Sequence, residues 1–204
     1  MSSFRMKFHP TDLFVLGYCA LTFVLILIIG RPLAQYGTEL AFYGGVGLLA
    51  IFLAKYVDDR KNRLTAFVRL LYPVILFSAF YSMTQGLIFL FTDSFQDAQL
   101  VTIEQTLFGQ ELTLLFDRIQ PNVVLTEILS FCYFSYYFMI PCFFLPVFIR
   151  RDYRILKEAT AAVCLTFFVS YLLFSLYPIE GPRWHFADQY VHAVDGPVFR
   201  QLVN

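Results

Sequence analysis

Charge is scarce in this chain of 204 residues. Only 15% of its residues are Asp, Glu, Lys or Arg, whereas soluble domains carry about a quarter. Hydrophobic residues make up 58% of the chain, with 25 Phe and 13 Tyr among them. This composition argues against a soluble domain and favours side chains that face lipid. The formal net charge is zero, so no overall positive field would draw the chain to nucleic acid.

Cysteine patterns that hold metals or disulfides are also missing. The chain has no Cys-x-x-Cys pair and no Cys/His cluster. Its four cysteines each lie inside an apolar stretch: Cys19, Cys132, Cys142 and Cys164. In such places cysteine usually behaves as a small hydrophobic residue. Neither a disulfide framework nor a zinc site is therefore expected.

Five long apolar stretches are present. They cover residues 13–30, 40–57, 70–91, 128–149 and 159–179. A helix needs about 20 apolar residues to cross a hydrocarbon core of about 30 Å, and continuous runs exclude the alternation of a β-barrel. The sequence predicts an all-α integral membrane protein, a bundle of about five transmembrane helices that forms a single membrane domain over 1–204. The first stretch could also be a signal peptide, but its length and the lack of a clear cleavage site favour an uncleaved anchor.

The basic residues are distributed unevenly between the two sides that these spans define. One side holds Arg5, Lys7, Lys55, Arg60, Lys61, Arg63, Arg69, Arg150, Arg151, Arg154 and Lys157. The other side holds only Arg31, Arg118, Arg183 and Arg200, together with most of the acidic residues. Because cytoplasmic loops are enriched in Lys and Arg, we expect a cytoplasmic N-terminus and an extracytoplasmic tail at 180–204.

Residues 92–122 form a segment too polar to cross a membrane. Leu100, Ile103, Leu107 and Leu114 recur in it at near-helical spacing, with Gly109 between them. We expect one or two short amphipathic helices lying on the outer interface and hinged near Gly109. The alternative is an ordinary surface loop.

The tail begins with the most informative motif, Tyr-Pro-Ile-Glu-Gly-Pro-Arg at 177–183, directly after the last span. Gly181 and Pro182 break the helix, and Arg183 is followed by Trp184 and His185. An arginine on a fixed turn suits a phosphate, because the guanidinium group presents a planar fork of donors. Tryptophan suits the depth of lipid headgroups. The alternative is an Arg-Trp interfacial anchor without chemistry.

These residues support a family resemblance. The 177–183 motif resembles the phosphatidic acid phosphatase type 2 superfamily, in particular its branch of inositol phosphorylceramide synthases (inositolphosphotransferases) and related bacterial proteins. The stretch Ile103–Gly109 and the Tyr-x-x-Tyr-Tyr motif at 133–137, which leads to Pro141, are similar to the same branch. The resemblance covers about 69–195.

The resemblance implies a lipid phosphatase or phosphotransferase that acts on phosphate esters of lipids at the extracytoplasmic face, in a bacterial inner membrane or its equivalent. It implies histidine chemistry without metal or other cofactor, a lipid phosphate as substrate and no nucleic-acid partner. Arg183 would bind the phosphate. Tyr177, Trp184, Tyr136 and Tyr137 are candidates to line the substrate site.

The chain departs from the family in its catalytic motifs. It has neither the Ser-x-His nor the His-x3-Asp motif, and its three histidines are His9, His185 and His192. His185 is the only candidate nucleophile, so the catalytic residues stay unknown. We expect the chain to be the N-terminal portion of a longer enzyme and to be inactive alone. The alternative is a non-catalytic membrane protein, such as a transporter-like bundle or a scaffold subunit.

A metal site is a second hypothesis for the tail. His185, Asp188, His192 and Asp195 are spaced three, four and three residues apart, which would place them on one face of a helix. Imidazole and carboxylate groups suit zinc or a similar ion. A plain polar face of the tail is the simpler interpretation.

Overall fold

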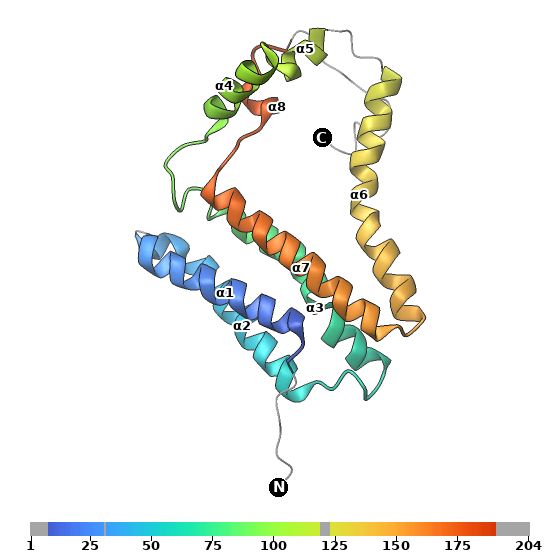
Figure 1. The fold of residues 1–204 in the computed structure, drawn as a ribbon. Coiled ribbons are helices and arrows are strands. Elements are labelled where there is room, and N and C mark those ends of the chain that lie inside the picture. Colours follow the sequence, from blue (N-terminus) through green and yellow to red (C-terminus); the bar gives the residue numbers. More distant parts are fainter. Residues whose placement is uncertain (1–7, 31, 119–122, 191–204) are drawn as a thin grey trace. The chain divides into compact units, whose positions relative to one another are not determined.

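The computed structural model describes residues 8–30, 32–118 and 123–190, and every regular element in these ranges is a helix (Figure 1). The elements are α1 (Pro10–Ile29), the 3-10 helix η1 (Leu33–Tyr36), α2 (Gly37–Tyr56), α3 (Arg63–Gln85), α4 (Asp97–Phe108), α5 (Leu112–Arg118), α6 (Val123–Ile149), α7 (Tyr153–Leu176) and α8 (Pro182–His185). In the described ranges α1, η1–α2, α3, α6 and α7 are long and apolar enough to cross a membrane. The prediction of an all-α integral membrane protein is confirmed.

Two of the spanning helices, α3 and α7, begin earlier than their apolar stretches, each with a polar side chain that caps its first turn. The Asn62 side chain accepts a hydrogen bond of 2.8 Å from the Thr65 backbone N–H, so α3 starts well before residue 70. The Asp152 side chain accepts one of 3.3 Å from the Ile155 N–H and starts α7. At its other end α3 stops at Gln85, and Leu87, two residues further on, is buried in the core.

The contacts within the chain group it into two compact units, each built from two separate segments. Unit 1 comprises residues 1–94 and 147–178, and unit 2 comprises 95–146 and 179–204. The expected single membrane domain stays a prediction.

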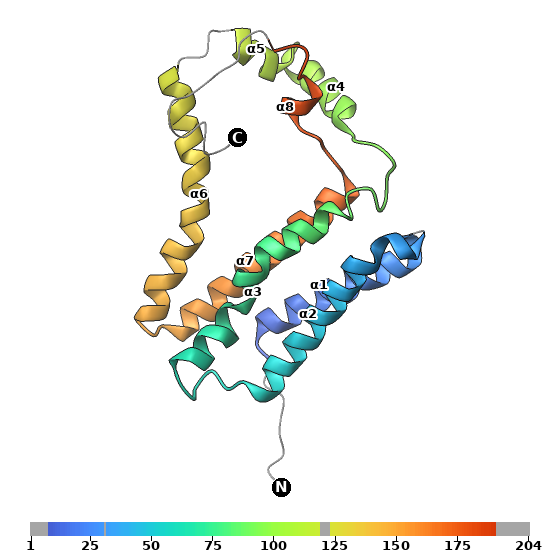
Figure 2. The ribbon, with the colours of Figure 1, turned by 180° about the vertical axis from the view of Figure 1, so that it is seen from behind.

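Unit 1 is held together by aromatic packing between its helices. α1 packs on α2 and α7, and α3 packs on α7 (Figures 1 and 2). The Tyr18 ring stacks on Phe168 with centroids 4.4 Å apart, and Tyr43 and Phe80 meet Tyr18 edge-on at 5.8 and 5.6 Å. Lipid offers no hydrophobic drive for helices to associate, so such close packing is what joins them.

A buried ion pair joins α1 to α3. The Arg69 guanidinium contacts the Asp12 carboxylate, and the Tyr72 hydroxyl donates a further hydrogen bond of 3.0 Å to Asp12. Sequence analysis counted Arg69 among the loop charges, but it lies inside α3 and is only 2% exposed. A buried guanidinium needs such a carboxylate because an unpaired buried charge is very costly.

A second ionic cluster lies beside the start of α1. The Lys157 ammonium lies 2.5 Å from the Asp59 carboxylate, and His9 Nε2 lies 3.5 Å from it. Burial acts to raise the pKa of Asp59, but the hydrogen bond and charge of Lys157 outweigh it and hold this pKa below its usual value. Burial, followed by the charges of Lys157 and Arg69, lowers the pKa of His9.

In unit 2, α4 and α5 meet at Gly109, whose φ of 72° is the left-handed conformation that glycine favours. Leu100, Ile103 and Leu107 are 38, 52 and 70% exposed along α4. An exposed apolar stripe is what an interfacial helix presents to lipid. The location of these helices on the outer membrane surface stays a prediction.

Candidate functional site

The turn that carries Arg183 is built by glycine and proline. Gly181 has a φ of 95°, which L side chains rarely adopt, and beyond its two chain neighbours no heavy atom lies within 4 Å of the position where a Cβ would be. The glycine is therefore needed for its backbone angle and not for space. Pro182 opens the single helical turn α8, and the Gly181 carbonyl accepts hydrogen bonds from the N–H groups of Trp184 and His185 at 3.1 and 3.0 Å.

A carboxylate from α4 anchors this turn. The two Asp97 oxygens accept hydrogen bonds from the backbone N–H groups of Glu180 and Gly181, at 2.9 and 3.0 Å. Asp97 is only 5% exposed and is the first residue of α4. Hydrogen bonds to an ionised carboxylate are stronger than neutral ones, so α4 fixes the backbone directly before Arg183.

Arg183 itself is exposed on α8, and its guanidinium lies 5.5 Å from the centroid of the Trp184 ring. Within the part of the chain that the structure describes, no carboxylate lies within ion-pair distance of Arg183. Its donors are therefore open to a ligand. Trp184 is 64% exposed beside it, as an aromatic group at headgroup depth would be.

An apolar groove lies beside this turn, within unit 2. The groove has a volume of about 350 Å³, and α4 contributes most of its wall through Leu100, Ile103 and Leu107. Pro182 and His185 contribute the α8 side. α8 lies beside α4 in both views of the fold (Figures 1 and 2). The groove therefore borders α8, the short helix that carries the exposed Arg183.

Of the predicted lining residues, the structure brings Trp184 to Arg183. Tyr136 and Tyr137 are exposed on α6, where the Tyr137 hydroxyl lies 3.3 Å from that of Tyr133. Tyr177 ends α7 and belongs to unit 1. The role of these three tyrosines in substrate binding stays a prediction.

The metal hypothesis is only partly within the described residues. α8 ends at His185, and Asp188 lies in the turn that follows, so no regular helix places these two on one face. His192 and Asp195 lie outside the described residues. Across 8–30, 32–118 and 123–190, no three His, Cys, Asp or Glu side chains form a group that could hold a metal ion.

Sequence reasoning missed the role of Asp97. The sequence gives Asp97 no feature that separates it from the other acidic residues of the segment 92–122. Its hydrogen-bond partners are 83 and 84 positions away, and no local pattern relates an acid in a polar segment to a distant glycine turn. Hydropathy and spacing could not have found this contact.

A comparison with known families gives one match. A family model described as the PAP2 superfamily matches residues 98–201, a little over half of the chain. The matched range contains α4 except its first residue Asp97, all of α8 and the Gly-Pro-Arg turn. No curated protein and no solved structure gives a significant match.

Proposed function

Because the chain belongs to the PAP2 superfamily, we propose that it carries the phosphate-binding part of an enzyme that hydrolyses or transfers phosphate esters of lipids. The reaction would take place at the extracytoplasmic face. Within the superfamily we propose the inositol phosphorylceramide synthase-like branch, on the motifs at 103–109, 133–137 and 177–183. The single observation that supports a phosphate site most directly is the anchored turn. It presents Arg183, which has no ionic partner among the described residues, on the short helix whose Pro182 and His185 line an apolar groove.

Arg183 would hold the phosphate. Its planar fork of N–H donors matches two phosphate oxygens at once, and no carboxylate in the described residues competes for it. In phosphoryl transfer, negative charge on the phosphate oxygens must be met by donors that are already in place. The two hydrogen bonds to Asp97 supply that fixed geometry.

The groove would take part of the lipid tail. Leu100, Ile103 and Leu107 belong to the apolar part of its α4 wall, which also includes Asp97 and Glu104. The headgroup would then extend toward α8 and Arg183. His185 lines the same groove and is the one candidate nucleophile of the described residues, but the family's motifs that would pair it with an acid are absent from this chain. The groove and the arginine therefore support binding, and the catalytic step is left to other residues.

The test uses the only tryptophan of the chain, Trp184, as a reporter of its neighbour. Purified protein in detergent micelles is titrated with dioctanoyl phosphatidic acid while Trp184 emission is followed. We expect a saturable change in emission. Arg183→Lys should weaken this binding roughly tenfold and Arg183→Ala further, because a bidentate, charge-assisted contact is worth about 1.5–3 kcal/mol.

The matched control is Arg150→Lys, which makes the same chemical change on an exposed arginine of the other unit. It should leave the titration unchanged. Dioctanoyl phosphatidylcholine, which has the same tails and no net charge, should give little change in emission. If phosphatidic acid leaves Trp184 emission unchanged, or if Arg183→Ala binds as wild type does, the proposed site is wrong.

A further inference from the structure

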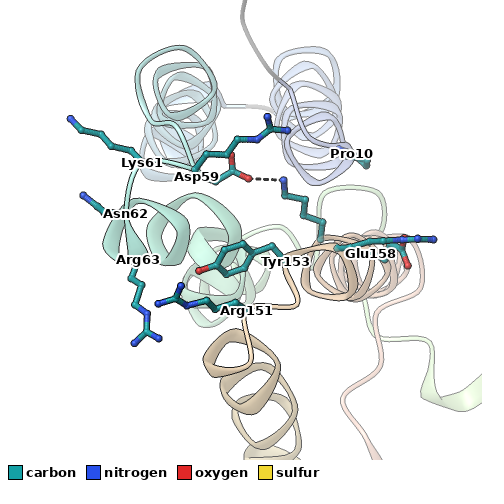
Figure 3. A pocket seen from close by; sticks show the side chains of 11 residues that line it. Pro10, Asp59, Lys61, Asn62, Arg63, Arg151, Tyr153 and Glu158 are labelled. Atoms are coloured by element: carbon teal, nitrogen blue, oxygen red, sulfur yellow. Dashed lines mark hydrogen bonds and ion pairs between the residues drawn. The ribbon is translucent and has the colours of Figure 1, made fainter.

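A second, separate cavity lies in unit 1, at the end where α1, α3 and α7 begin. It has a volume of about 860 Å³ and is lined from the start of α1, the α2–α3 loop, the α6–α7 turn and the first turns of α7 (Figure 3). Six of its lining residues are basic: Arg60, Lys61, Arg63, Arg151, Arg154 and Lys157. Two are acidic: Asp59 and Glu158. We call this the basic cavity.

The two acids of the basic cavity are already paired. Asp59 lies 2.5 Å from the Lys157 ammonium, the contact drawn as a dashed line in Figure 3. Glu158 lies 3.1 Å from Arg154.

The other four basic side chains, Arg60, Lys61, Arg63 and Arg151, have no ionic partner within the described ranges. The starts of three long helices add their positive dipole ends to the same region. The basic cavity therefore has an unbalanced positive field.

Arg151 stands in a backbone conformation that arginine does not favour. Its φ is 61°, and it is the only described residue other than glycine with a positive φ. The turn that it forms has the hydrogen bonds of a helix C-cap, from the Arg151 N–H to Phe148 at 3.0 Å and from the Asp152 N–H to Val147 at 3.2 Å. Glycine is the usual residue at such a position. A strained residue in a cavity is grounds for a functional hypothesis, since folding alone would be served better by glycine.

We propose that the basic cavity is a binding site for a phosphate group with more than one negative charge, which is contacted by Arg63 at the start of α3 and by Arg151 in the α6–α7 turn. Arginine matches phosphate because its fork donates to two oxygens. A phosphate monoester carries a charge of about −1.5 to −2 at neutral pH, so it can form ion pairs with several of these basic side chains at once. A carboxylate carries a single charge and would neutralise only one of them.

The position of the cavity favours a lipid headgroup as the source of this phosphate. Helix ends of a membrane bundle lie at headgroup depth, and on the proposed orientation this end faces the cytoplasmic leaflet, whose anionic lipids attract such basic clusters. A soluble phosphate ester has the same chemistry. The site is independent of the one at Arg183, because all its lining residues belong to unit 1.

The experiment uses the full chain carrying Arg183→Ala, so that the site in unit 2 does not contribute. Three probes are compared by the shift that each causes in the midpoint of thermal unfolding, and by binding titration: dioctanoyl phosphatidic acid, dioctanoyl phosphatidylcholine and inorganic phosphate. We expect phosphatidic acid to bind and to raise the midpoint, and phosphatidylcholine to do neither. Tighter binding of phosphatidic acid than of inorganic phosphate assigns the lipid source, whereas equal binding assigns the soluble one.

Two variants distinguish a site from a general effect of charge. Arg151→Gly removes a proposed contact and relieves the backbone at φ 61°, so it should fold at least as well as its parent and bind phosphatidic acid at least about tenfold more weakly. Arg150→Gln removes the same charge one position away, outside the cavity lining, and should bind as its parent does. If the two variants weaken binding equally, or if neither phosphatidic acid nor inorganic phosphate binds, the basic cavity is not a phosphate site.

Discussion

The Arg69 guanidinium donates hydrogen bonds to both carboxylate oxygens of Asp12, a residue 57 positions earlier in the chain. Both side chains are almost fully buried, and the contact ties α3 to the first turn of α1. The Asp12 carboxylate also accepts a hydrogen bond of 2.7 Å from the His9 backbone N–H. One carboxylate therefore caps α1 and neutralises an arginine of α3.

We expect Arg69→Met to destabilise unit 1 by about 3–5 kcal/mol, because it leaves the Asp12 charge buried without a partner. The double variant Asp12→Asn with Arg69→Met removes both charges and should recover much of this loss. The measurement is the midpoint of unfolding in detergent micelles. An Arg69→Met protein as stable as wild type would show that the pair contributes nothing.

The lowered pKa of His9 predicts a pH dependence of stability. Because the folded state holds this pKa below its unfolded value of about 6.5, the unfolded state binds the proton more readily. The stability contributed by neutral His9 is present above about pH 6.5 and is lost as the pH falls through the folded pKa. The unfolding midpoint should fall between pH 7 and pH 5 in wild type and fall less in His9→Gln. Equal slopes in the two proteins would contradict this.

Asp97 should act as a positioning residue for Arg183. Asp97→Ala removes both hydrogen bonds that hold the backbone at Glu180 and Gly181, so phosphatidic acid binding reported by Trp184 should weaken severalfold. Asp97→Asn keeps one acceptor oxygen and should retain part of the affinity. The spanning helices of unit 1 should unfold as before. Asp97→Ala binding with wild-type affinity would exclude this role.

The proposed orientation can be tested by labelling cysteines in intact cells. Asn62 is unsuitable for replacement because it caps α3, so the cytoplasmic reporter is Lys61→Cys and the outer one is Gln189→Cys. In a background without the exposed Cys132 and Cys142, an impermeant thiol reagent should label position 189 and spare position 61. The reverse labelling would overturn the orientation and the proposed location of the Arg183 site.

We expect this chain to bind lipid phosphate without turning it over. Transfer through histidine needs a nucleophile and a proton donor at one site, and this sequence has neither family motif that supplies them. The measurement is release of phosphate from dioctanoyl phosphatidic acid by the purified chain. Release that is abolished by His185→Ala would identify His185 as a nucleophile and contradict the expectation.

The sequence was sufficient to predict what depends on hydropathy and local turn chemistry. The five spans follow from their apolar length, and the turn that opens α8 follows from Gly181 and Pro182. It was not sufficient for contacts between distant polar residues. Arg69 was counted as a loop charge because the apolar stretch begins only at residue 70, and nothing near it in the sequence indicates its partner Asp12. Likewise, nothing near Asp97 in the sequence indicates its hydrogen bonds to the turn at Gly181. Helix packing decides which acidic side chain contacts which distant partner, and composition and spacing do not reveal that packing.

The anchoring of the Arg183 turn by Asp97 also bears on how this chain could be divided or compared. The family match begins at residue 98, one position after the carboxylate that holds the turn. A fragment that began at residue 98 would contain Arg183 and most of the groove wall, but it would lack Asp97 and both of its hydrogen bonds to the turn. If Asp97 positions Arg183 as proposed, the functional unit begins before the first residue that the family model matches. Alignments of relatives that extend upstream should then show an acid at this position wherever the Gly-Pro-Arg turn is kept.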